Sequence, residues 1–360
     1  PIGIFMKEWL TLYNSKSGER GIYNRQSAVE KSLENGRRNP DYDFGTNPCS
    51  EIILRPYQFC NLTEVVVRAE DTMADLIRKV KLSSILGTFQ ASLTDFKYLR
   101  KVWKDNTEEE RLLGVSLTGI MDNTLLNSSN DPHLDTRLED LKKVAIQTNK
   151  EYAERLNIPQ STAITCVKPS GTVSQLVDSA SGIHARHSKY YIRTVRGDKK
   201  DPLTQFMVEK GVPAEDDITQ PENTTVFSFP IESPSNSVTR NDTSAVEQLN
   251  LWLTYQKFWC EHKPSVTITV KEDEWLDVGA WVYNNFDNVA GISFLPHSDH
   301  TYKQAPYQEC SKKEYLDLLK KMPKKLDWQE LIDYEVEDST RGGQELACSA
   351  DSCEIVDIGA

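Results

Sequence analysis

The sequence predicts an α/β fold, because short apolar runs alternate with longer segments that repeat their apolar residues at helical spacing. Ile52-Ile53-Leu54 and Val65-Val66-Val67 are typical of strands that are buried in a sheet. The segment 134–156 repeats its apolar residues as an amphipathic helix does. Strands that alternate with helices are typical of parallel β/α units. With 360 residues, of which 38% are hydrophobic, the chain is long enough for a large core in one or two domains.

Taken in order, the chain offers helices and strands along most of its length. Helices are expected at 5–13, 71–90, from Thr107 into 112–115, and at 134–156, 201–211, 245–260 and 274–284. Strands are expected at 52–54, 65–67, 162–167, 226–231, 265–270 and 290–295. The segment 14–38 has the composition of a loop.

The chain becomes strongly charged after Pro306. Lysine pairs at 312–313, 320–321 and 324–325 favour a surface helix, followed by a helical turn near 328–331. We therefore expect a main body over 1–310, surface helices over 311–341 and a flexible tail over 342–360.

Charge and cysteine content narrow the class of protein. The net charge of -12 disfavours a broad nucleic-acid interface, and no apolar run is long enough to cross a membrane. The chain opens at Pro1 without a secretory signal, which indicates a truncated or processed start. Seven cysteines, an odd number, favour a reducing cytoplasm over a disulfide scaffold. We interpret Cys166, Cys260 and Cys310 as structural.

The stretch Asn47-Pro48-Cys49-Ser50-Glu51-Ile52 sets a cysteine between an amide and a carboxylate. Pro48 fixes the backbone before Cys49 and favours a stiff loop tip. Cys49 and Glu51 are two apart, so an extended segment would point both side chains to one side. A second thiol follows at Cys60. The alternative is a strand entrance with one buried cysteine, since free cysteine is often buried.

A second motif, Lys168-Pro169-Ser170-Gly171-Thr172-Val173-Ser174, follows a predicted strand at once. Backbone N–H groups and two hydroxyls at the start of a helix can converge on a phosphate. The alternative is a turn that only caps its helix. His184 and His187 are three apart without an acidic or thiol partner nearby, so we expect no metal site.

Two further cysteines, Cys348 and Cys353, lie in the predicted tail. Two thiols on a mobile terminus favour dithiol–disulfide exchange. The alternative is half of a zinc site, although no second Cys or His pair lies near them in the sequence.

Together these motifs resemble the catalytic subunit of ribonucleotide reductase over nearly the whole chain. The stretch 47–52 resembles its finger loop, Cys60-Asn61-Leu62 its second active-site thiol, and 168–172 its substrate-phosphate loop. The stretches 291–296 and 302–307 resemble the adenosylcobalamin-dependent (class II) branch. The resemblance implies part of a ten-stranded α/β barrel, namely the finger loop at 44–60 and the second five-stranded half.

The resemblance also implies roles for single residues. Cys49 would become a thiyl radical and abstract the ribose 3′ hydrogen, Glu51 would act as general base, and Asn47 would bind the ribose or orient Glu51. Cys60 would supply electrons with a partner thiol that this sequence lacks. The phosphate would be held by Pro169, Ser170, Gly171, Thr172 and Val173. Cys348 and Cys353 would re-reduce the site and exchange with thioredoxin or a similar dithiol donor.

The implied cofactor is adenosylcobalamin. Class I enzymes use paired tyrosines near the C-terminus, whereas the one adjacent pair in this sequence, Tyr190-Tyr191, lies far from the end. The surroundings of Gly359 do not resemble a glycyl-radical motif.

The first half-barrel is missing from this sequence, so we expect the chain to need a separate N-terminal half for full activity. The implied reaction is reduction of ribonucleotides, with triphosphates favoured, for DNA synthesis. Two other functions stay open: a thiol–disulfide oxidoreductase that uses Cys348 and Cys353, and an inactive nucleotide-binding remnant.

Overall fold

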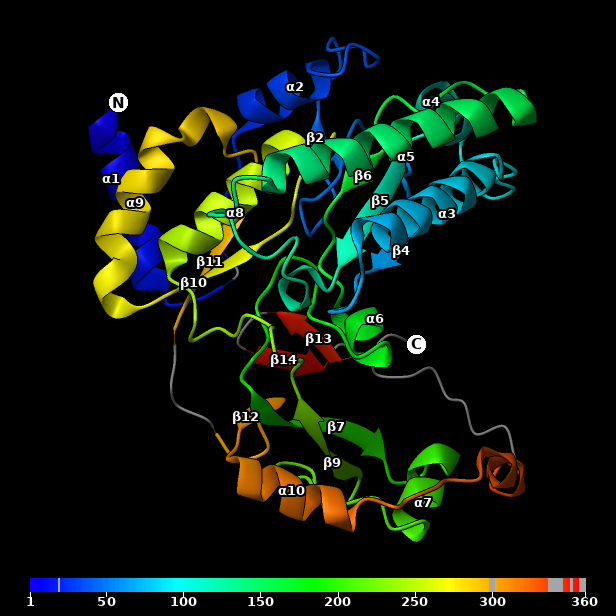
Figure 1. The fold of residues 1–360 in the computed structure, drawn as a ribbon, viewed down its shortest axis with the longest axis vertical. Helices are drawn as coiled ribbons and strands as arrows, with labels where there is room; N and C mark the ends of the chain where they lie inside the picture. Colours follow the sequence, from blue (N-terminus) through cyan, green and yellow to red (C-terminus); the bar gives the residue numbers. More distant parts are fainter. Residues whose placement is uncertain (19, 298–301, 336–345, 350–351, 356–360) are drawn as a thin grey trace. The chain divides into compact units, whose positions relative to one another are not determined.

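A computed structural model describes residues 1–18, 20–297, 302–335, 346–349 and 352–355 (Figure 1). The chain divides into two compact units. The first unit is Pro1–Arg186 with Asn236–His297, and the second is His187–Ser235 with Ser298–Ala360. This division follows contacts in space, and the domain boundaries expected at 310 and 341 stay predictions.

The first unit is built on parallel strands. β4 (Asn61–Val66), β5 (Leu113–Thr118) and β6 (Thr165–Cys166) form one parallel sheet in that order. β10 (Thr267–Val270) pairs parallel with β11 (Ile292–Pro296), and β1 (Gly21–Ile22) pairs antiparallel with β11. A parallel bridge between Val167 and Pro264 joins the two sheets. The predicted parallel β/α units are therefore confirmed, with five parallel strands in the order β4, β5, β6, β10, β11.

Helices connect these strands and cover the sheet (Figure 1). They are α3 (Met73–Ala91), α5 (Leu134–Leu156), α8 (Ala245–Phe258) and α9 (Trp275–Asn284). Capping boxes start α3 at Thr72 and α8 at Ser244. In each box the hydroxyl of the capping residue accepts a hydrogen bond from the backbone N–H three residues later, at Asp75 or Glu247. The carboxylate of that later residue accepts from the backbone N–H of the capping residue. Trp252 of α8 and Trp259, directly after its end, are fully buried in the core. The helix predicted at 134–156 is confirmed at both ends.

The N-terminal helix α1 (Ile2–Ser15) packs on α9 through a close contact at a glycine. The Trp9 indole donates to the Trp275 carbonyl at 3.2 Å, and its ring meets Phe294 edge-on. A Cβ at Gly279 would lie 2.6 Å from Trp9 Nε1. Gly279 is therefore needed for α1 to approach α9 this closely.

The second unit is an antiparallel sheet. Its strands, in sheet order, are β12 (Tyr307–Glu309), β7 (Tyr190–Asp198), β9 (Thr224–Glu232) and β8 (Ala214–Asp216). This unit also contains α7 (Pro202–Glu209), α10 (Lys312–Lys321) and the 3-10 helix η4 (Trp328–Asp333). The surface helix and the helical turn expected after Pro306 are confirmed. A two-stranded hairpin, β13 (Leu346–Ser349) and β14 (Ser352–Ile355), follows.

Two expectations for secondary structure were wrong, and one strand was predicted correctly but with the wrong pairing. The strand expected at 226–231 is confirmed as part of β9, but it pairs antiparallel rather than parallel, because alternation of residues does not reveal strand direction. The loop expected at 14–38 contains α2 (Arg25–Leu33), which the Asn24 side chain caps but which carries few apolar residues. The helix expected from Thr107 into 112–115 is instead the end of α4 (Lys101–Glu110) followed by the fully buried strand β5.

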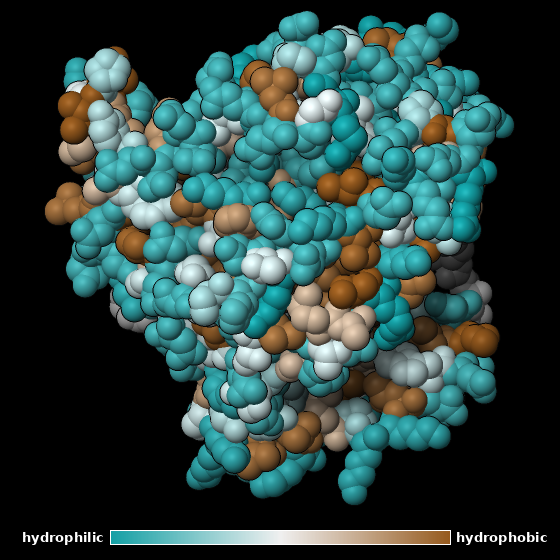
Figure 2. Space-filling model, turned by 45° about the horizontal axis from the view of Figure 1, so that its top comes forward, coloured by the Kyte–Doolittle hydropathy of each residue, from teal (hydrophilic) through white to brown (hydrophobic). Residues whose placement is uncertain are grey.

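The surface is mostly hydrophilic, with apolar patches between the polar side chains (Figure 2). One open groove of about 840 Å³ lies beside β4, which is the edge strand of its sheet among the described residues. The α3 side of the groove exposes Leu82, Leu86, Phe89 and Leu93. Among the described residues, no helix is both long enough and apolar enough to span a membrane.

Gly114 tests the packing between β4 and β5. A Cβ at this position would overlap Leu62 Cδ2 and lie 3.2 Å from Cys166 Sγ. We expect Gly114→Ala to lower the free energy of unfolding by about 1–3 kcal/mol, measured by urea denaturation. Gly45→Ala is the matched control, because no atom lies within 4 Å of its Cβ position. Equal stabilities of the two variants would contradict this packing.

Candidate functional site

Cys49 lies at the tip of a short β-hairpin. β2 (Gly45–Thr46) pairs antiparallel with β3 (Ile53–Leu54), and residues 47–52 close the loop between them. The Ser50 N–H donates to the Asn47 carbonyl at 2.9 Å, and the Ile52 N–H donates to Asn47 Oδ1 at 2.9 Å. Ser50 takes a left-handed conformation with φ 65°. Asn47 is therefore the residue that holds this turn closed, and Cys49 is exposed at its tip.

The turn corrects one expectation about Cys49 and Glu51. The segment is not extended, so residue alternation does not bring these side chains together. Glu51 is fully buried, and neither of its carboxylate oxygens has a hydrogen-bond partner. The Glu51 charge still affects Cys49. Burial is the larger effect that raises the pKa of the Cys49 thiol, the Glu51 charge raises it further, and the Lys168 charge lowers it. The raised pKa favours the protonated thiol form of Cys49.

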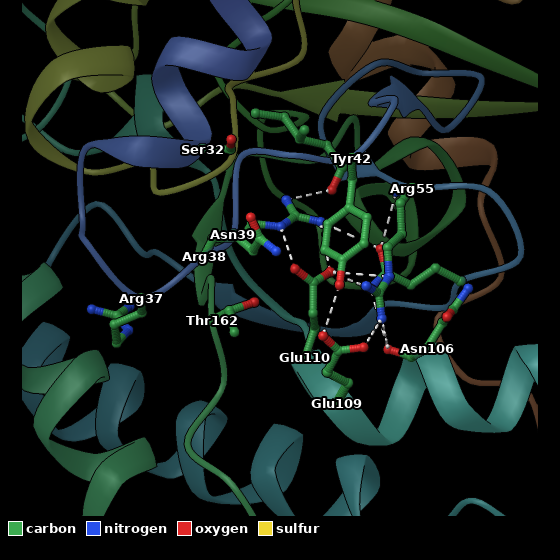
Figure 3. Close-up of polar contacts among 12 residues, drawn as sticks. Ser32, Arg37, Arg38, Asn39, Tyr42, Arg55, Asn106, Glu109, Glu110 and Thr162 are labelled. Atoms are coloured by element: carbon green, nitrogen blue, oxygen red, sulfur yellow. Dashed lines mark hydrogen bonds and ion pairs between the residues drawn. The ribbon is translucent and has the colours of Figure 1, made fainter.

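A buried ion-pair network fixes the base of the hairpin (Figure 3). The Arg38 guanidinium donates to both Glu110 oxygens at 2.9 and 3.0 Å, and a third N–H donates to the Ile53 carbonyl at 2.8 Å. Gln58 also donates to Glu110 and accepts from the Arg55 N–H at 3.1 Å. This clamp joins β3, the chain leading to Cys60 and the end of α4.

A second layer of the same network is more exposed. Arg55 donates to Glu109 at 2.7 Å, and the Tyr42 hydroxyl donates to the same carboxylate at 2.9 Å. The Arg55 guanidinium also stacks over the Tyr42 ring at 4.2 Å. Figure 3 shows these side chains converging on the end of α4 from the hairpin and from the chain before it.

The segment Glu261-His262-Lys263 supports the hairpin from the other side. The Lys263 N–H donates to the Glu51 carbonyl at 3.0 Å. His262 Nδ1 accepts from the Ile53 N–H at 3.4 Å, and its Nε2 lies 3.0 Å from the Leu113 carbonyl of β5. Burial is the larger cause, and the Arg38 charge the next, that lowers the pKa of His262 to about 3. The ring is therefore neutral and links Ile53 to Leu113 by hydrogen bonds.

Cys60 lies directly before β4, in a half-buried position. Burial raises the pKa of its thiol, the Arg38 charge lowers it, and the Glu51 charge raises it again. The Glu51 charge also raises the pKa of buried Cys166 on β6. Cys49, Cys60 and Cys166 therefore all lie within electrostatic reach of one carboxylate.

The predicted phosphate turn starts the short helix α6 (Gly171–Leu176). Gly171, Thr172 and Val173 are exposed, whereas Ser170 is buried with its hydroxyl oxygen unpartnered. The Ser170 N–H donates to Ser181 Oγ at 3.0 Å. The Ser170 side chain does not cap α6 by a hydrogen bond, so the capping alternative gains no support.

Several other predicted residues lie elsewhere. Cys348 and Cys353 face each other in the backbone register of β13 and β14, in the second unit. Residues 342–345, 350–351 and 356–360 of the expected tail, including Gly359, lie outside the described residues. His184 accepts from the Thr267 N–H at 3.0 Å and bonds the Ser181 carbonyl, so it ties two segments together.

Sequence reasoning missed Arg38, Glu110, His262 and Lys263. Glu110 was interpreted as part of a helix start, and Arg38 as the end of a loop. For His262 and Lys263 one signal was available. It was the run of three ionisable residues at 261–263, directly after a predicted helix.

Known proteins similar to this chain include adenosylcobalamin-dependent ribonucleoside-triphosphate reductases; no family model matches it. The enzyme of that name from Euglena gracilis is 28% identical over 346 residues, which cover 94% of this chain and 46% of the relative. A "probable" enzyme of that name from Dictyostelium discoideum is 31% identical over 327 residues, covering 87% of this chain and 40% of the relative. The chain thus spans less than half the length of these curated relatives.

Solved structures agree in fold. A B-12 dependent (class II) ribonucleotide reductase matches with a TM-score of 0.73 and 23% identity, over 92% of this chain and 50% of that chain. The chain is a relative of the ribonucleotide reductases. The matched share fits the expected C-terminal portion of a reductase, and the α/β fold expected from the resemblance is confirmed.

The clamp at the hairpin base of this reductase relative is testable through Arg38. Arg38→Met leaves the Glu110 carboxylate buried without its bidentate partner, which is expected to cost about 3–5 kcal/mol in the free energy of unfolding. The control is Arg25→Met, since the Arg25–Asp43 pair is exposed and contributes less than about 1 kcal/mol. Chemical denaturation of both variants measures the difference, and a loss at Arg38 no greater than at Arg25 would refute the clamp.

Proposed function

We propose that this chain carries the radical site of a ribonucleoside-triphosphate reductase, which converts ribonucleotides to 2′-deoxyribonucleotides for DNA synthesis. The observation that carries the proposal is the exposed Cys49 thiol at a hairpin tip with the buried Glu51 carboxylate behind it. The names of the relatives, which match 87–94% of this chain in the two cases above, support the same reaction.

Cys49 and Glu51 act on the sugar from the same hairpin. Cys49, as a thiyl radical, takes the hydrogen atom from the ribose 3′ carbon, and Glu51 accepts the proton of the 3′ hydroxyl. A thiol kept protonated by its surroundings is the form that exchanges a hydrogen atom. Asn47 uses its Oδ1 to close the turn, so its amide nitrogen is the group left for the ribose.

Cys60 supplies reducing equivalents. The 2′ hydroxyl leaves as water, two thiols are oxidised to one disulfide, and the 3′ hydrogen returns to the sugar from Cys49. Burial keeps Cys60 in its thiol form, so its proton is available to the departing hydroxyl. Its partner thiol is expected on the N-terminal half of the reductase.

The turn at Pro169, Ser170, Gly171, Thr172 and Val173 binds the substrate phosphates. The exposed residues Gly171 and Thr172 at the start of α6 and the unpartnered Ser170 hydroxyl support this role. Anchoring the phosphates fixes the sugar over Cys49 and so replaces a random encounter with a positioned one.

The cofactor of this proposal is adenosylcobalamin, as in the names of the relatives. A cofactor of that size can reach a thiol only at an exposed position, and Cys49 fits that requirement. When bound, the cofactor supplies the one-electron chemistry that generates the thiyl radical. The chain contributes the placement of Cys49.

Two protein partners complete the proposal. One partner is an N-terminal half of the reductase. In the described part of the chain β4 is an edge strand, and this edge together with the apolar groove beside it supports such a partner. Cys348 and Cys353 re-reduce the active-site disulfide and then exchange with thioredoxin or a similar dithiol donor. Their opposed positions in β13 and β14 support a dithiol pair.

The two alternatives explain fewer features. A thiol–disulfide oxidoreductase needs the tail cysteines alone and leaves the Cys49 hairpin and the Ser170 turn without a role. An inactive remnant does not account for the joint presence of Cys49, Glu51, Cys60 and both tail cysteines.

Substitution of Cys49 tests the radical site. We expect Cys49→Ser, assayed with an N-terminal half, a ribonucleoside triphosphate, adenosylcobalamin and a dithiol, to form no detectable deoxynucleotide, because an alcohol does not replace the thiol as hydrogen-atom carrier. Nucleotide binding, measured by calorimetry, should stay within about twofold, since the phosphate turn is unchanged. Cys260→Ala is the control, because it removes a buried thiol that has no part in the proposed reaction. Deoxynucleotide formation by Cys49→Ser at the rate of the control would disprove the proposal.

Substitution of the tail thiols tests the reducing path. Cys348→Ser with Cys353→Ser should complete about one turnover and then stop with thioredoxin as reductant, whereas a small dithiol should restore multiple turnovers. The control is Cys310→Ser, which removes a half-buried thiol of the same unit. Undiminished turnover of the double variant with thioredoxin would rule out this path.

A further inference from the structure

Lys263 is a fully buried lysine whose ammonium lies under the turn that carries Cys49. Its Nζ donates to Ser50 Oγ at 2.6 Å and to the Ala290 carbonyl at 2.9 Å. Its backbone N–H donates to the Glu51 carbonyl at 3.0 Å. Lys263 therefore bonds the two residues that follow Cys49: Ser50 through its side chain and Glu51 through its backbone.

The space around this contact is tight. A Cβ at Gly291 would lie 2.6 Å from Lys263 Nζ and would overlap the Ser50 hydroxyl. The glycine is thus needed for the ammonium and the hydroxyl to meet. The Tyr23 ring lies 5.1 Å from the same ammonium and closes another side.

The charge of Lys263 has one nearby counterpart in the turn. Burial lowers the pKa of Lys263 to about 7, and the Glu51 charge opposes that shift. A lysine and a carboxylate that share one dry region each make burial of the other less costly. The Glu51 oxygens have no hydrogen-bond partner among the described residues, so a positive charge on Lys263 offsets part of the cost of burying them.

We propose that Lys263 is a positioning residue for the radical site: its ammonium holds the Ser50 hydroxyl and so fixes the direction of Cys49. The effect on the reaction rate rests on the proposed function. The effect on the conformation of the Cys49 turn, which is the structural half of the inference, does not. Lys263 itself need not touch the substrate.

A left-handed conformation at a residue other than glycine is costly and persists only where its surroundings hold it. Ser50 has φ 65°, and its hydroxyl oxygen accepts the hydrogen bond from the Lys263 ammonium. Without the ammonium the turn can relax, and the thiol at position 49 then samples directions that do not face the sugar. A small change in direction is sufficient to lower the rate of a reaction that depends on positioning.

The test uses Lys263→Ala in the full 360-residue chain. Hydrogen exchange at the Ser50 and Ile52 amides should become about tenfold to hundredfold faster, since a hydrogen bond to a charged group is lost. The Val115 amide, which donates to the Ile164 carbonyl within the sheet, reports global opening and is the internal reference. Added propylammonium should occupy the space left by the side chain and restore slow exchange.

The matched control is Lys31→Ala. Lys31 is also buried and also donates to a backbone carbonyl, that of Gln256 at 2.6 Å, but its contacts lie outside the Cys49 turn. A merely structural loss would speed exchange at Val115 in both variants. It would leave the ratio of turn exchange to Val115 exchange unchanged.

The catalytic half is measured in the complete reductase with its N-terminal half. Lys263→Ala should lower kcat about tenfold or more with KM within about twofold, because the phosphate turn still holds the nucleotide. Propylammonium should recover part of kcat in Lys263→Ala and none in Lys31→Ala. A kcat equal to that of the unaltered enzyme, or turn exchange in Lys263→Ala no faster than in Lys31→Ala, would overturn the inference. If the unaltered enzyme itself forms no deoxynucleotide, the proposed function fails and the catalytic half of the inference fails with it, while the exchange comparison still decides the structural half.

Discussion

The buried Arg38–Glu110 ion pair is the interaction on which the Cys49 hairpin depends. Both side chains are almost fully buried, so each has lost its water shell at a cost of several kcal/mol. Bidentate geometry, the Ile53 carbonyl and the Gln58 amide offset that cost by satisfying the remaining donors and acceptors. A two-stranded hairpin of four paired residues is not stable by itself. The clamp therefore explains how so short a hairpin can hold a reactive residue in place.

The tip of the hairpin carries an exposed thiol and a carboxylate that is shielded from water. Cys49 is open to large ligands, whereas Glu51, two residues later, is withdrawn from water together with the Lys263 ammonium. Two features place an exposed thiol and a buried carboxylate within a few residues of each other. Gly291 lets the Lys263 ammonium and the Ser50 hydroxyl approach closely, and the Asn47 side chain closes the turn. Radical transfer needs access to the thiol, and proton transfer to a carboxylate is most effective away from bulk water. The hairpin provides both conditions.

The sequence predicted the fold better than it predicted the geometry of the site. The helix at 134–156 and the buried strands followed from apolar spacing, which is a local signal. The antiparallel pairing of β9 did not, because strand direction depends on partners far along the chain. The same limit applies to the site: Cys49, Glu51 and the Ser170 turn stand in short motifs, whereas Arg38, Glu110 and Lys263 act over separations of 15 to 213 residues. Cys49 and Glu51 were paired for a wrong reason, since the segment is a turn rather than a strand.

The most direct test of the central claim is a kinetic isotope effect at the ribose 3′ carbon. A nucleotide that carries deuterium at this carbon is compared with the unlabelled nucleotide in the complete reductase, with turnover measured as deoxynucleotide formed. If Cys49 takes the 3′ hydrogen, the labelled nucleotide should react more slowly, and the deuterium should remain at the 3′ carbon of the product. Formation of deoxynucleotide with loss of the 3′ deuterium to water and no isotope effect would contradict the account.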